Sequence, residues 1–494
     1  MPHDQTDRIV DLFVIGGGVN GCAIARDGVG RGLSVTLAEQ GDLAGATSSA
    51  SSKLLHGGLR YLETYAFKLV REGLRERGVL LDMLPHIAWP MRFVLPHHAG
   101  LRPRWMLRAG LFLYDHLAPL RGGAEKSRGI DLRTHPGGRL LKDRYTQGFE
   151  YSDGWVDDAR LVVLNARDAH ERGAEILTRT TVLKARCAGD IWEIEIDTGA
   201  GLETRRARRL VNAAGPWAGI VSDHLGEPHK VRLVRGSHLV IPRLEGHDQP
   251  YILQGQDGRI VFLIPYEEDF TLIGTTEADH GSDPAAPRCT DAETDYLVAF
   301  VNDYLATPIS RDEIVWSYSG VRPLVDTGGD ATSASRDFQL LRDDSGGAPL
   351  LTVLGGKITT FRVLAEHALD KLDVPGSWTS GAALPGGDFA RGDKPAMVKA
   401  LMADYPFLTA PWARRLVTAY GTDARRILGA AQTADDLGRH FGATLTEAEV
   451  QHLREHEFAR TAEDIVWRRS KLGLRMTEGE IAALDAWLAG EEGQ

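Results

Sequence analysis

One stretch near the N-terminus, residues 11–42, has the pattern of a complete dinucleotide-binding βαβ unit. An apolar run at residues 12–15 precedes three spaced glycines, Gly16, Gly18 and Gly21. In such units the first glycine permits a tight turn, the second lets the backbone approach a pyrophosphate, and the third allows a helix and a strand to pack closely. An acid about 20 residues further on accepts a hydrogen bond from a ribose hydroxyl, and Glu39 occupies that place. The stretch therefore predicts a dinucleotide site, and Glu39 disfavours the 2′-phosphate of NADP.

Length and composition limit the remaining possibilities. A chain of 494 residues, 43% hydrophobic, is too long for one core and indicates two or three domains. Its net charge of −11 argues against nucleic-acid binding, because phosphate backbones favour basic surfaces. The three cysteines form no CxxC pair, so neither a disulfide framework nor a metal site is indicated, and a reducing compartment such as the cytoplasm fits. Neither a signal peptide nor a membrane-spanning run is evident.

The distribution of strand, helix and turn patterns indicates an α/β fold with a discontinuous Rossmann-type domain. Nucleotide-directed segments lie far apart, which implies that another, β-rich domain is inserted between them. After residue 387 the chain changes to amphipathic helical periodicity. The expected boundaries are 1–95, 149–230 and 329–387 for the cofactor-binding domain, 96–148 and 231–328 for the β-rich substrate (cap) domain, and 388–494 for an all-helical domain.

A loop rich in small and hydroxylated residues, GATSSASSKLLHGGLRYLE at 45–63, follows the second strand of the βαβ unit. Its hydroxyls and backbone N–H groups would lie beside the pyrophosphate and ring of a bound cofactor. The alternative is a solvated serine-rich loop, which would not normally lead into an apolar segment carrying an isolated His and Arg. The cofactor contacts expected from this loop are Thr47, Ser48, Ser49, Ser52, Lys53, Leu55, His56 and Gly57.

A second glycine turn lies near the end of the cofactor domain. Residues 350–372 predict a strand, the pair Gly355-Gly356, and a helix with Thr359 or Thr360 in its first turn. A helix N-terminus together with Lys357 would stabilise the negative charge of a reduced flavin, although Lys357 could instead be a surface lysine. Further cofactor contacts are expected from three regions, at Val182, at Ala214 and Gly215, and at Gly356, Lys357 and Thr359.

Blocks along nearly the whole chain resemble the FAD-dependent, quinone-linked glycerol-3-phosphate dehydrogenases, the aerobic enzymes. They include SSASSKLLHGGLRYLE, NAAGPW at 212–217, RLVRGSHLV at 232–240, LIGTTEAD at 272–279, SYSGVRPL at 317–324, LGGKITTFR at 354–362 and, in the helical tail, DIVWRRSKLG at 464–473. The resemblance implies that FAD is the cofactor and that sn-glycerol 3-phosphate is oxidised to dihydroxyacetone phosphate. It further implies hydride transfer from C2 to flavin N5 and electron transfer onward to ubiquinone or another quinone.

The resemblance also suggests roles for individual residues. A phosphate monoester calls for forked cationic donors, which Arg60, Arg322 and Arg336 could supply, with Tyr61 and Lys357 also binding substrate. Oxidation requires a base for the C2 hydroxyl proton. His238, within the GSH block, is the first candidate and His56 the second, with Arg322 as a further catalytic residue, although a histidine is more often structural. The segment before Arg336, residues 326–335, matches the family pattern only loosely.

Residues 101–121 combine arginines with large apolar side chains in a chain that is acidic overall. On a helix, Arg104 and Arg108 share one face and the rest is mostly apolar, which is typical of a segment lying in a lipid headgroup layer. A second basic cluster surrounds Trp467: Arg468, Arg469, Lys471 and Arg475. The two segments suggest a peripheral protein on the inner face of the cytoplasmic membrane. A homodimer would agree with the family that the chain resembles. The alternative for residues 101–121 is a buried helix lining the substrate domain.

Four other functions compete with this interpretation. A glycerol-3-phosphate oxidase would share the blocks but pass electrons to oxygen. An amine or amino-acid oxidase would need a carboxylate site in place of phosphate-binding arginines, and the GSH and GVRP blocks weigh against it. A nucleotide-binding sensor would have lost the substrate residues, yet Arg60, Arg322 and Lys357 are present. An NAD-dependent dehydrogenase would not need the serine-rich and GGK blocks.

Overall fold

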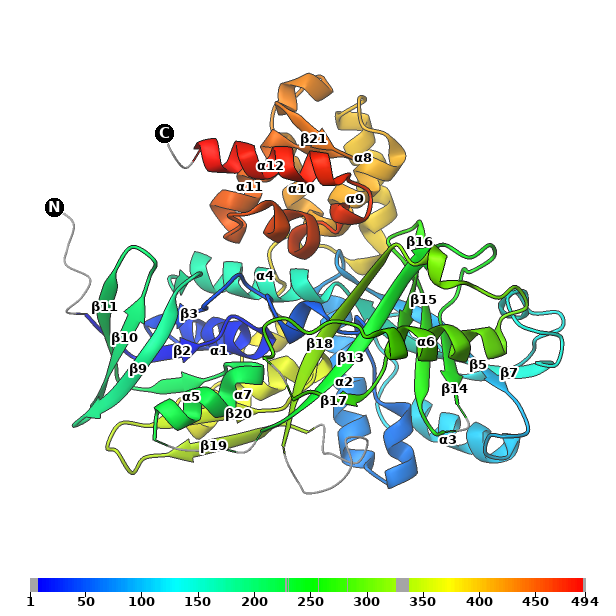
Figure 1. The fold of residues 1–494 in the computed structure, drawn as a ribbon, viewed down its shortest axis with the longest axis horizontal. Coiled ribbons are helices and arrows are strands. Elements are labelled where there is room, and N and C mark those ends of the chain that lie inside the picture. The colour runs from blue at the N-terminus through cyan, green and yellow to red at the C-terminus, as the bar shows by residue number, and fades with distance from the viewer. Residues whose placement is uncertain are drawn as a thin grey trace.

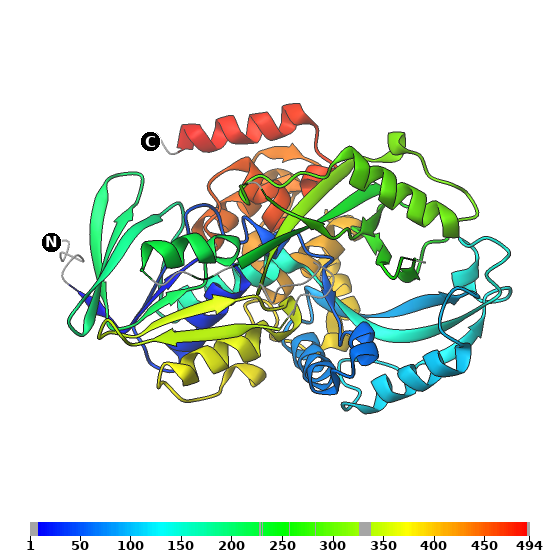
Figure 2. The ribbon, with the colours of Figure 1, turned by 60° about the horizontal axis from the view of Figure 1, so that its bottom comes forward.

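The computed structural model describes residues 8–226, 229, 231–255, 257–281, 283–325 and 337–491, so Arg336 lies outside the described residues. Two large sheets lie side by side, and the C-terminal helices cover the region where they meet (Figures 1 and 2). The expected α/β class, with a discontinuous Rossmann-type domain, a β-rich insertion and a helical C-terminal domain, is confirmed.

The first sheet has the strand order β19-β20-β12-β2-β3-β8 and is parallel except for β19. Its strands are β2 (Leu12–Ile15), β3 (Val35–Ala38), β8 (Glu175–Leu177), β12 (Leu210–Asn212), β19 (Gln339–Asp343) and β20 (Leu350–Leu354). The helices α1 (Val19–Gly30), α4 (Asp158–Glu171) and α7 (Phe361–Lys371) pack together with it. Parallel strands that are buried on both faces have continuous apolar sequences, as residues 12–15 do. Three separate parts of the chain thus form one core.

The second sheet has the order β17-β13-β16-β15-β14-β5-β7-β4, with β18 beside β13 and β6 beside β7. Its strands are β4 (Leu54–Leu55), β5 (Ala88–His97), β6 (Arg128–Asp131), β7 (Gln147–Val156), β13 (Val231–Pro242), β14 (Tyr251–Gln254), β15 (Ile260–Tyr266), β16 (Phe270–Gly274), β17 (Ala278–Asp279) and β18 (Trp316–Val325). The helices α2 (Phe67–Met83), α3 (Arg104–His116) and α6 (Asp291–Tyr304) accompany it.

The second sheet differs from the expected domain boundaries at three strands. The boundaries place β4 and most of β5 and β7 in the cofactor-binding domain, whereas β4 and β5 both pair with β7 within the second sheet. The reason is that motif positions indicate where the site lies, while sheet membership depends on long-range pairing that the local pattern does not contain.

A small four-stranded sheet completes the cofactor-binding half: β1 (Ile9–Val10), β9 (Thr181–Ala188), β10 (Ile191–Asp197) and β11 (Leu202–Ala207). It forms one end of the molecule, with the hairpin β9–β10 at its edge (Figure 2). The helix α5 (Ala218–His224) follows β12.

The C-terminal domain has its own hydrophobic core. Its helices are α8 (Lys394–Asp404), α9 (Ala410–Tyr420), α10 (Ala424–Leu428), α11 (Glu447–Glu457), the π-helix Asp464–Arg469 and α12 (Glu478–Glu491). A short hairpin of β21 (His440–Gly442) and β22 (Leu445–Thr446) interrupts the expected all-helical pattern. A buried ion pair between Arg160 of α4 and Glu457 anchors this domain to the cofactor-binding domain.

The basic cluster around Trp467 does not form the expected membrane surface. Arg468 and Arg469 both donate to the carboxylate of Asp42, Lys471 is buried, and Arg475 pairs with Asp269 of the second sheet. Trp467 stacks on Trp316 with 4.5 Å between ring centroids. The cluster is therefore part of the contact between domains, because its positive charges meet carboxylates that come from distant parts of the sequence.

Candidate functional site

A cavity of about 540 Å³ lies where five parallel strands of the first sheet end. The lining residues that follow β2, β3, β8, β12 and β20 are Gly16 and Gly18, 39–42, 180–182, 213–217 and 355–358. The opposite wall comes from the second sheet, through Phe262 of β15, Thr275 after β16 and Arg322 of β18. Ligands of open α/β sheets bind at the carboxyl ends of the strands. The cavity between the two sheets is therefore the candidate active site.

The glycine turn after β2 brings backbone close to backbone. Gly16 has φ +111°, and a Cβ there would lie 2.5 Å from the carbonyl oxygen of Ala213. A Cβ at Gly21 would lie 1.9 Å from the carbonyl oxygen of Gly16, so this position tolerates no side chain. Gly16 and Gly18 line the cavity, whereas Gly21 is absent from its described lining and acts through close packing. The N-terminus of α1 thus opens into the cavity, where its N–H groups favour an anion.

Glu39 reaches the cavity from the end of β3. One carboxylate oxygen accepts from the N–H of Gly17 at 2.7 Å and the other from the N–H of Gly41 at 2.8 Å. Burial raises the pKa of Glu39, and the two backbone hydrogen bonds oppose that shift. A carboxylate oxygen has two acceptor sites, so each can accept a further hydroxyl donor.

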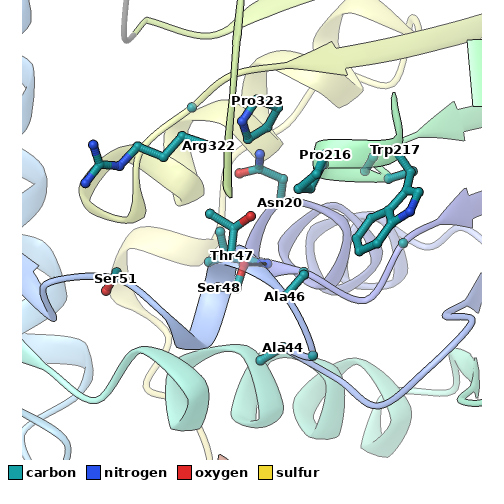
Figure 3. A pocket seen from close by; sticks show the side chains of 18 of the residues that line it. Asn20, Ala44, Ala46, Thr47, Ser48, Ser51, Pro216, Trp217, Arg322 and Pro323 are labelled. Carbon is teal, nitrogen blue, oxygen red and sulfur yellow. Dashed lines mark hydrogen bonds between the residues drawn. The ribbon is translucent and has the colours of Figure 1, made fainter. Parts of the chain in front are cut away.

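The serine-rich loop contributes four of its eight expected cofactor contacts to the cavity lining: Thr47, Ser48, Ser52 and His56. Ser48 Oγ accepts from the N–H of Val19 at 3.0 Å, which ties the loop to the first residue of α1. Figure 3 shows Thr47 and Ser48 between Arg322 on one side and Trp217 on the other. Of the remaining expected contacts, Val182, Ala214, Gly215, Gly356 and Lys357 also line the cavity.

The other four of the eight contacts expected from this loop are absent from the described lining of the cavity. Ser49 lines an adjoining cavity of about 430 Å³, Leu55 is part of the core in β4, and Gly57 packs against Leu74. Lys53 is 1% exposed and forms a 2.6 Å ion pair with Asp158 of α4. These residues support the loop rather than line the cavity. The buried ammonium of Lys53 needs a nearby carboxylate, which Asp158 provides.

Arg322, Lys357 and Tyr61 form a cluster of side chains at the cavity, near β18 and the turn Gly355-Gly356-Lys357 (the GGK turn). The guanidinium of Arg322, 27% exposed, lies 3.6 Å from the carboxylate of Glu277 and donates to Thr275 Oγ1 at 3.4 Å. A Cβ at Gly236 would lie 2.8 Å from this guanidinium. The Arg322 guanidinium therefore lies beside Gly236 of β13, where only a residue without a side chain leaves room.

Lys357 lies over the ring of Tyr61, with its Nζ 4.2 Å from the ring centroid. Gly58 has φ +76°, and a Cβ there would lie 2.2 Å from that ring. Both Tyr61 and Lys357 line the cavity together with His56. Arg60 lies in the 3₁₀ turn Leu59–Thr64, and its side chain falls outside the described structure.

The helix expected after the GGK turn begins with a 3₁₀ turn, Ile358–Thr360, followed by α7. Thr359 is buried and absent from the described cavity lining. Its Oγ1 accepts from the N–H of His56 at 3.3 Å. Thr359 thus holds the backbone of His56, whereas a contact with the cofactor was expected.

His238 is buried behind the cavity wall and is not among its described lining residues. Its Nε2 is in hydrogen-bond contact with Ser52 Oγ at 2.9 Å, and its ring stacks on Tyr318 at 4.7 Å. Burial, with smaller effects from Arg322 and Lys53, lowers the pKa of His238 well below its usual value. The imidazole is therefore neutral at pH 7, and Ser52 stands between it and the cavity.

Sequence reasoning missed several lining residues, among them Asn20, Trp217, Phe262 and Thr275. Trp217 and Thr275 belong to the recognised blocks NAAGPW and LIGTTEAD, so their position in those blocks was an available signal. Asn20 lies between Gly18 and Gly21 of the glycine turn, which was also an available signal, whereas Phe262 had none.

The lining fits a dinucleotide cofactor. Asn20 Nδ2 donates to the carbonyl of Gly355, while its buried Oδ1 has no hydrogen-bond partner among the described residues. Buried polar atoms without partners are rare, so this oxygen indicates a missing donor. The α1 N-terminus, the hydroxyls of Thr47 and Ser48, and the carboxylate of Glu39 complete a donor and acceptor set for pyrophosphate and ribose.

Comparison with known proteins agrees with this site. The family described as FAD dependent oxidoreductase matches residues 11–362, and the C-terminal domain of alpha-glycerophosphate oxidase matches residues 377–489. The structure of the glycerol-3-phosphate dehydrogenase from Bacillus halodurans complexed with FAD superposes with a TM-score of 0.79 at 25% identity, covering 99% of this chain and 92% of that one. The expectation of FAD as cofactor is confirmed.

Curated relatives extend the likeness over the whole chain. The aerobic glycerol-3-phosphate dehydrogenase of Escherichia coli (strain K12) is 48% identical over 491 residues, which is 97% of both chains. The D-erythritol 1-phosphate dehydrogenase of Brucella abortus (strain 2308) is also 48% identical, with the same coverage. From the site, the matched domains and these relatives, the chain belongs to the family of FAD-dependent glycerol-3-phosphate dehydrogenases.

Proposed function

We propose that this protein oxidises sn-glycerol 3-phosphate to dihydroxyacetone phosphate and passes the electrons to a membrane quinone. The observation that carries the proposal is one cavity that joins a dinucleotide-binding strand edge to Arg322 and Lys357. The FAD bound there supplies the hydride acceptor. The names of the E. coli and Pseudomonas aeruginosa relatives, each 48% identical, support glycerol 3-phosphate as the substrate.

Substrate binding would depend on Arg322, Lys357 and Tyr61. A phosphate monoester carries nearly two negative charges at pH 7, and a guanidinium can donate to two of its oxygens at once. Lys357, above the Tyr61 ring, adds a second positive charge to the same cavity. Arg60 and Arg336 remain predicted phosphate ligands.

Removal of the hydroxyl proton would depend on Ser52 and His238. A general base must be unprotonated at the working pH and within hydrogen-bond reach of the proton, directly or through one intermediate group. His238 is neutral but buried, so we propose that the C2 hydroxyl donates to Ser52 Oγ while Ser52 donates to His238 Nε2. His56, on the cavity wall, is the second candidate.

A second candidate substrate is D-erythritol 1-phosphate, because the Brucella abortus relative matches at the same identity. Both compounds are polyol phosphates, so the phosphate-binding residues do not separate them. The ratio of kcat/KM for the two substrates, measured with an artificial electron acceptor, decides. A ratio above one for sn-glycerol 3-phosphate supports the proposal, and a ratio below one assigns the erythritol phosphate.

The electron acceptor is a separate proposal, with molecular oxygen as the alternative. The L-alpha-glycerophosphate oxidase of Mycoplasma pneumoniae shares the fold, with a TM-score of 0.61 at 18% identity. Reoxidation of the reduced enzyme in two anaerobically prepared aliquots distinguishes the acceptors. Faster reoxidation by a ubiquinone analogue than by air supports the quinone, and the reverse order indicates an oxidase.

The surface of α3 supports a peripheral membrane location on the inner face of the cytoplasmic membrane. Trp105 is 69% exposed and Phe112 is 56% exposed, and Arg104 and Arg108 lie on the same helix. Figure 1 shows α3 on the side of the molecule opposite the C-terminal domain. Exposed aromatic side chains among arginines suit a helix lying in the headgroup layer. Among the residues that the structure describes, none forms a helix long and apolar enough to cross a bilayer.

Vesicle sedimentation tests the membrane proposal. The double variant Trp105→Ser/Phe112→Ser should bind vesicles containing anionic lipid less than the wild type does. The matched control is Leu202→Ser, which removes a 66% exposed apolar side chain from β11 at the far end of the molecule. Equal loss of binding in both variants, or none in either, would contradict a specific role for α3.

A further inference from the structure

Among the residues that the structure describes, one segment of the C-terminal domain reaches the cofactor cavity. Glu463, just before the π-helix Asp464–Arg469, and Arg468, within it, line the cavity. π-helical turns are rare and occur often at functional sites. Residues 39–42 and 180–182 of the cofactor-binding domain line the same cavity. Two domains that are far apart in sequence therefore enclose the same space.

Asp42 joins the two domains through ion pairs with two arginines of the π-helix. Arg469 donates from two nitrogens to the two carboxylate oxygens of Asp42, at 2.6 and 2.8 Å. Arg468 donates from Nε to the same carboxylate at 2.5 Å. The side chain of Arg469 is fully buried and that of Asp42 nearly so. Bidentate guanidinium–carboxylate contacts of this kind fix geometry as well as charge.

This cluster also holds the loop that carries Glu39. The N–H of Gly41, one residue before Asp42, donates to the Glu39 carboxylate, and the carbonyl of Gly41 accepts from the N–H of Arg179 at 2.8 Å. The guanidinium of Arg179 in turn donates to Asp464 of the π-helix at 2.7 Å. The loops after β3 and β8 are thus each bonded to the C-terminal domain.

We propose that the C-terminal domain acts as a clamp on the FAD, with Arg468, Arg469 and Asp42 as positioning residues. Through Asp42 the two arginines hold the Glu39 loop in its binding geometry, while Glu463 and Arg468 close the cavity. FAD can then leave only when the ion-pair cluster opens. Because coupling between two binding events is reciprocal, bound FAD also holds the C-terminal domain in place.

The rate of FAD release from purified holoenzyme tests the clamp without relying on turnover. Arg468→Gln removes one donor to Asp42 and leaves Arg469 in place, and we expect release about tenfold faster or more. Arg468→Lys retains the charge and should give an intermediate rate. The matched control is Arg414→Gln, because Arg414 joins the C-terminal domain to Glu268 by an exposed ion pair away from the cavity. Release from Arg468→Gln at the wild-type rate, or equally fast release from the control, would overturn the proposal.

A second measurement uses the native chain alone and does not depend on how a variant folds. Limited proteolysis of the linker between α7 and α8, residues 372–393, should be slower in the FAD-bound protein than in the deflavinated protein. Equal cleavage rates in the two forms would show that the cofactor and the domain contact are not coupled, which would also overturn the clamp.

Discussion

Replacing Arg322 with methionine tests whether the cavity recognises a phosphate. Arg322 lines the cavity with a half-buried guanidinium that is fixed by Thr275 and faces Glu277 at 3.6 Å. A hydrogen bond to a charged group contributes about 1.5–3 kcal/mol, so losing one lowers kcat/KM by about 10- to 150-fold. Without the arginine, the Glu277 carboxylate would repel the phosphate. We therefore expect a loss near the upper end of this range.

The assay is flavin reduction by sn-glycerol 3-phosphate under anaerobic conditions, compared between the wild type, Arg322→Met and Arg322→Lys. The lysine variant keeps the charge but loses the forked donors, so its loss should be intermediate. Glycerol, which lacks the phosphate, serves as the control substrate, and its slow reduction rate should be the same in all three proteins. If Arg322→Met slowed glycerol and glycerol 3-phosphate equally, Arg322 would shape the site without binding phosphate, and this reasoning would be refuted.

Three further predictions concern cofactor loading and stability. Gly21→Ala should give protein without bound flavin, because its Cβ would lie 1.9 Å from a backbone oxygen. The control Gly110→Ala, with open space around its Cβ, should bind flavin normally. The flavin absorbance of the two purified proteins tests this prediction. Lys53→Met leaves the buried Asp158 unpaired and should lower the free energy of unfolding by about 3–5 kcal/mol in a denaturant titration, and an unchanged stability would contradict its structural role. Burial lowers the pKa of His86 from 6.5 to about 3. Between these two pH values the unfolded state binds a proton that the folded state does not. The free energy of unfolding therefore falls by about 1.4 kcal/mol for each unit by which the pH is lowered in this range. His86→Phe should therefore show a shallower fall of Tm between pH 6.5 and 4.5, and parallel curves would contradict this.

The parts of the site that follow local rules were predictable from the sequence. The glycine turn after β2, the acid after β3 and the GGK turn after β20 each contain their own signal, because tight turns and strand ends depend on neighbouring residues. All three lie at the cavity, and so do Ala214 and Val182 from separate segments. The recognised blocks also led to Arg322 and Tyr61, which line the cavity as well.

The parts that depend on distant partners were not predictable in the same way. Lys53 lies within a run of cofactor-contacting residues, and nothing nearby shows that its ammonium turns back to Asp158. The arginines beside Trp467 were expected at a lipid surface, yet their partner is Asp42, more than 400 positions away. A basic cluster shows only that a negative charge is needed, and tertiary structure decides whether a lipid or a carboxylate provides it.

Anaerobic addition of sn-glycerol 3-phosphate to the purified, flavin-loaded protein tests whether the cavity binds and oxidises this substrate. We predict that sn-glycerol 3-phosphate bleaches the flavin absorbance at concentrations where glycerol does not, and that D-erythritol 1-phosphate does so more slowly. If sn-glycerol 3-phosphate left the flavin oxidised, or reduced it no faster than glycerol does, the assignment of the cavity as a glycerol 3-phosphate site would be wrong.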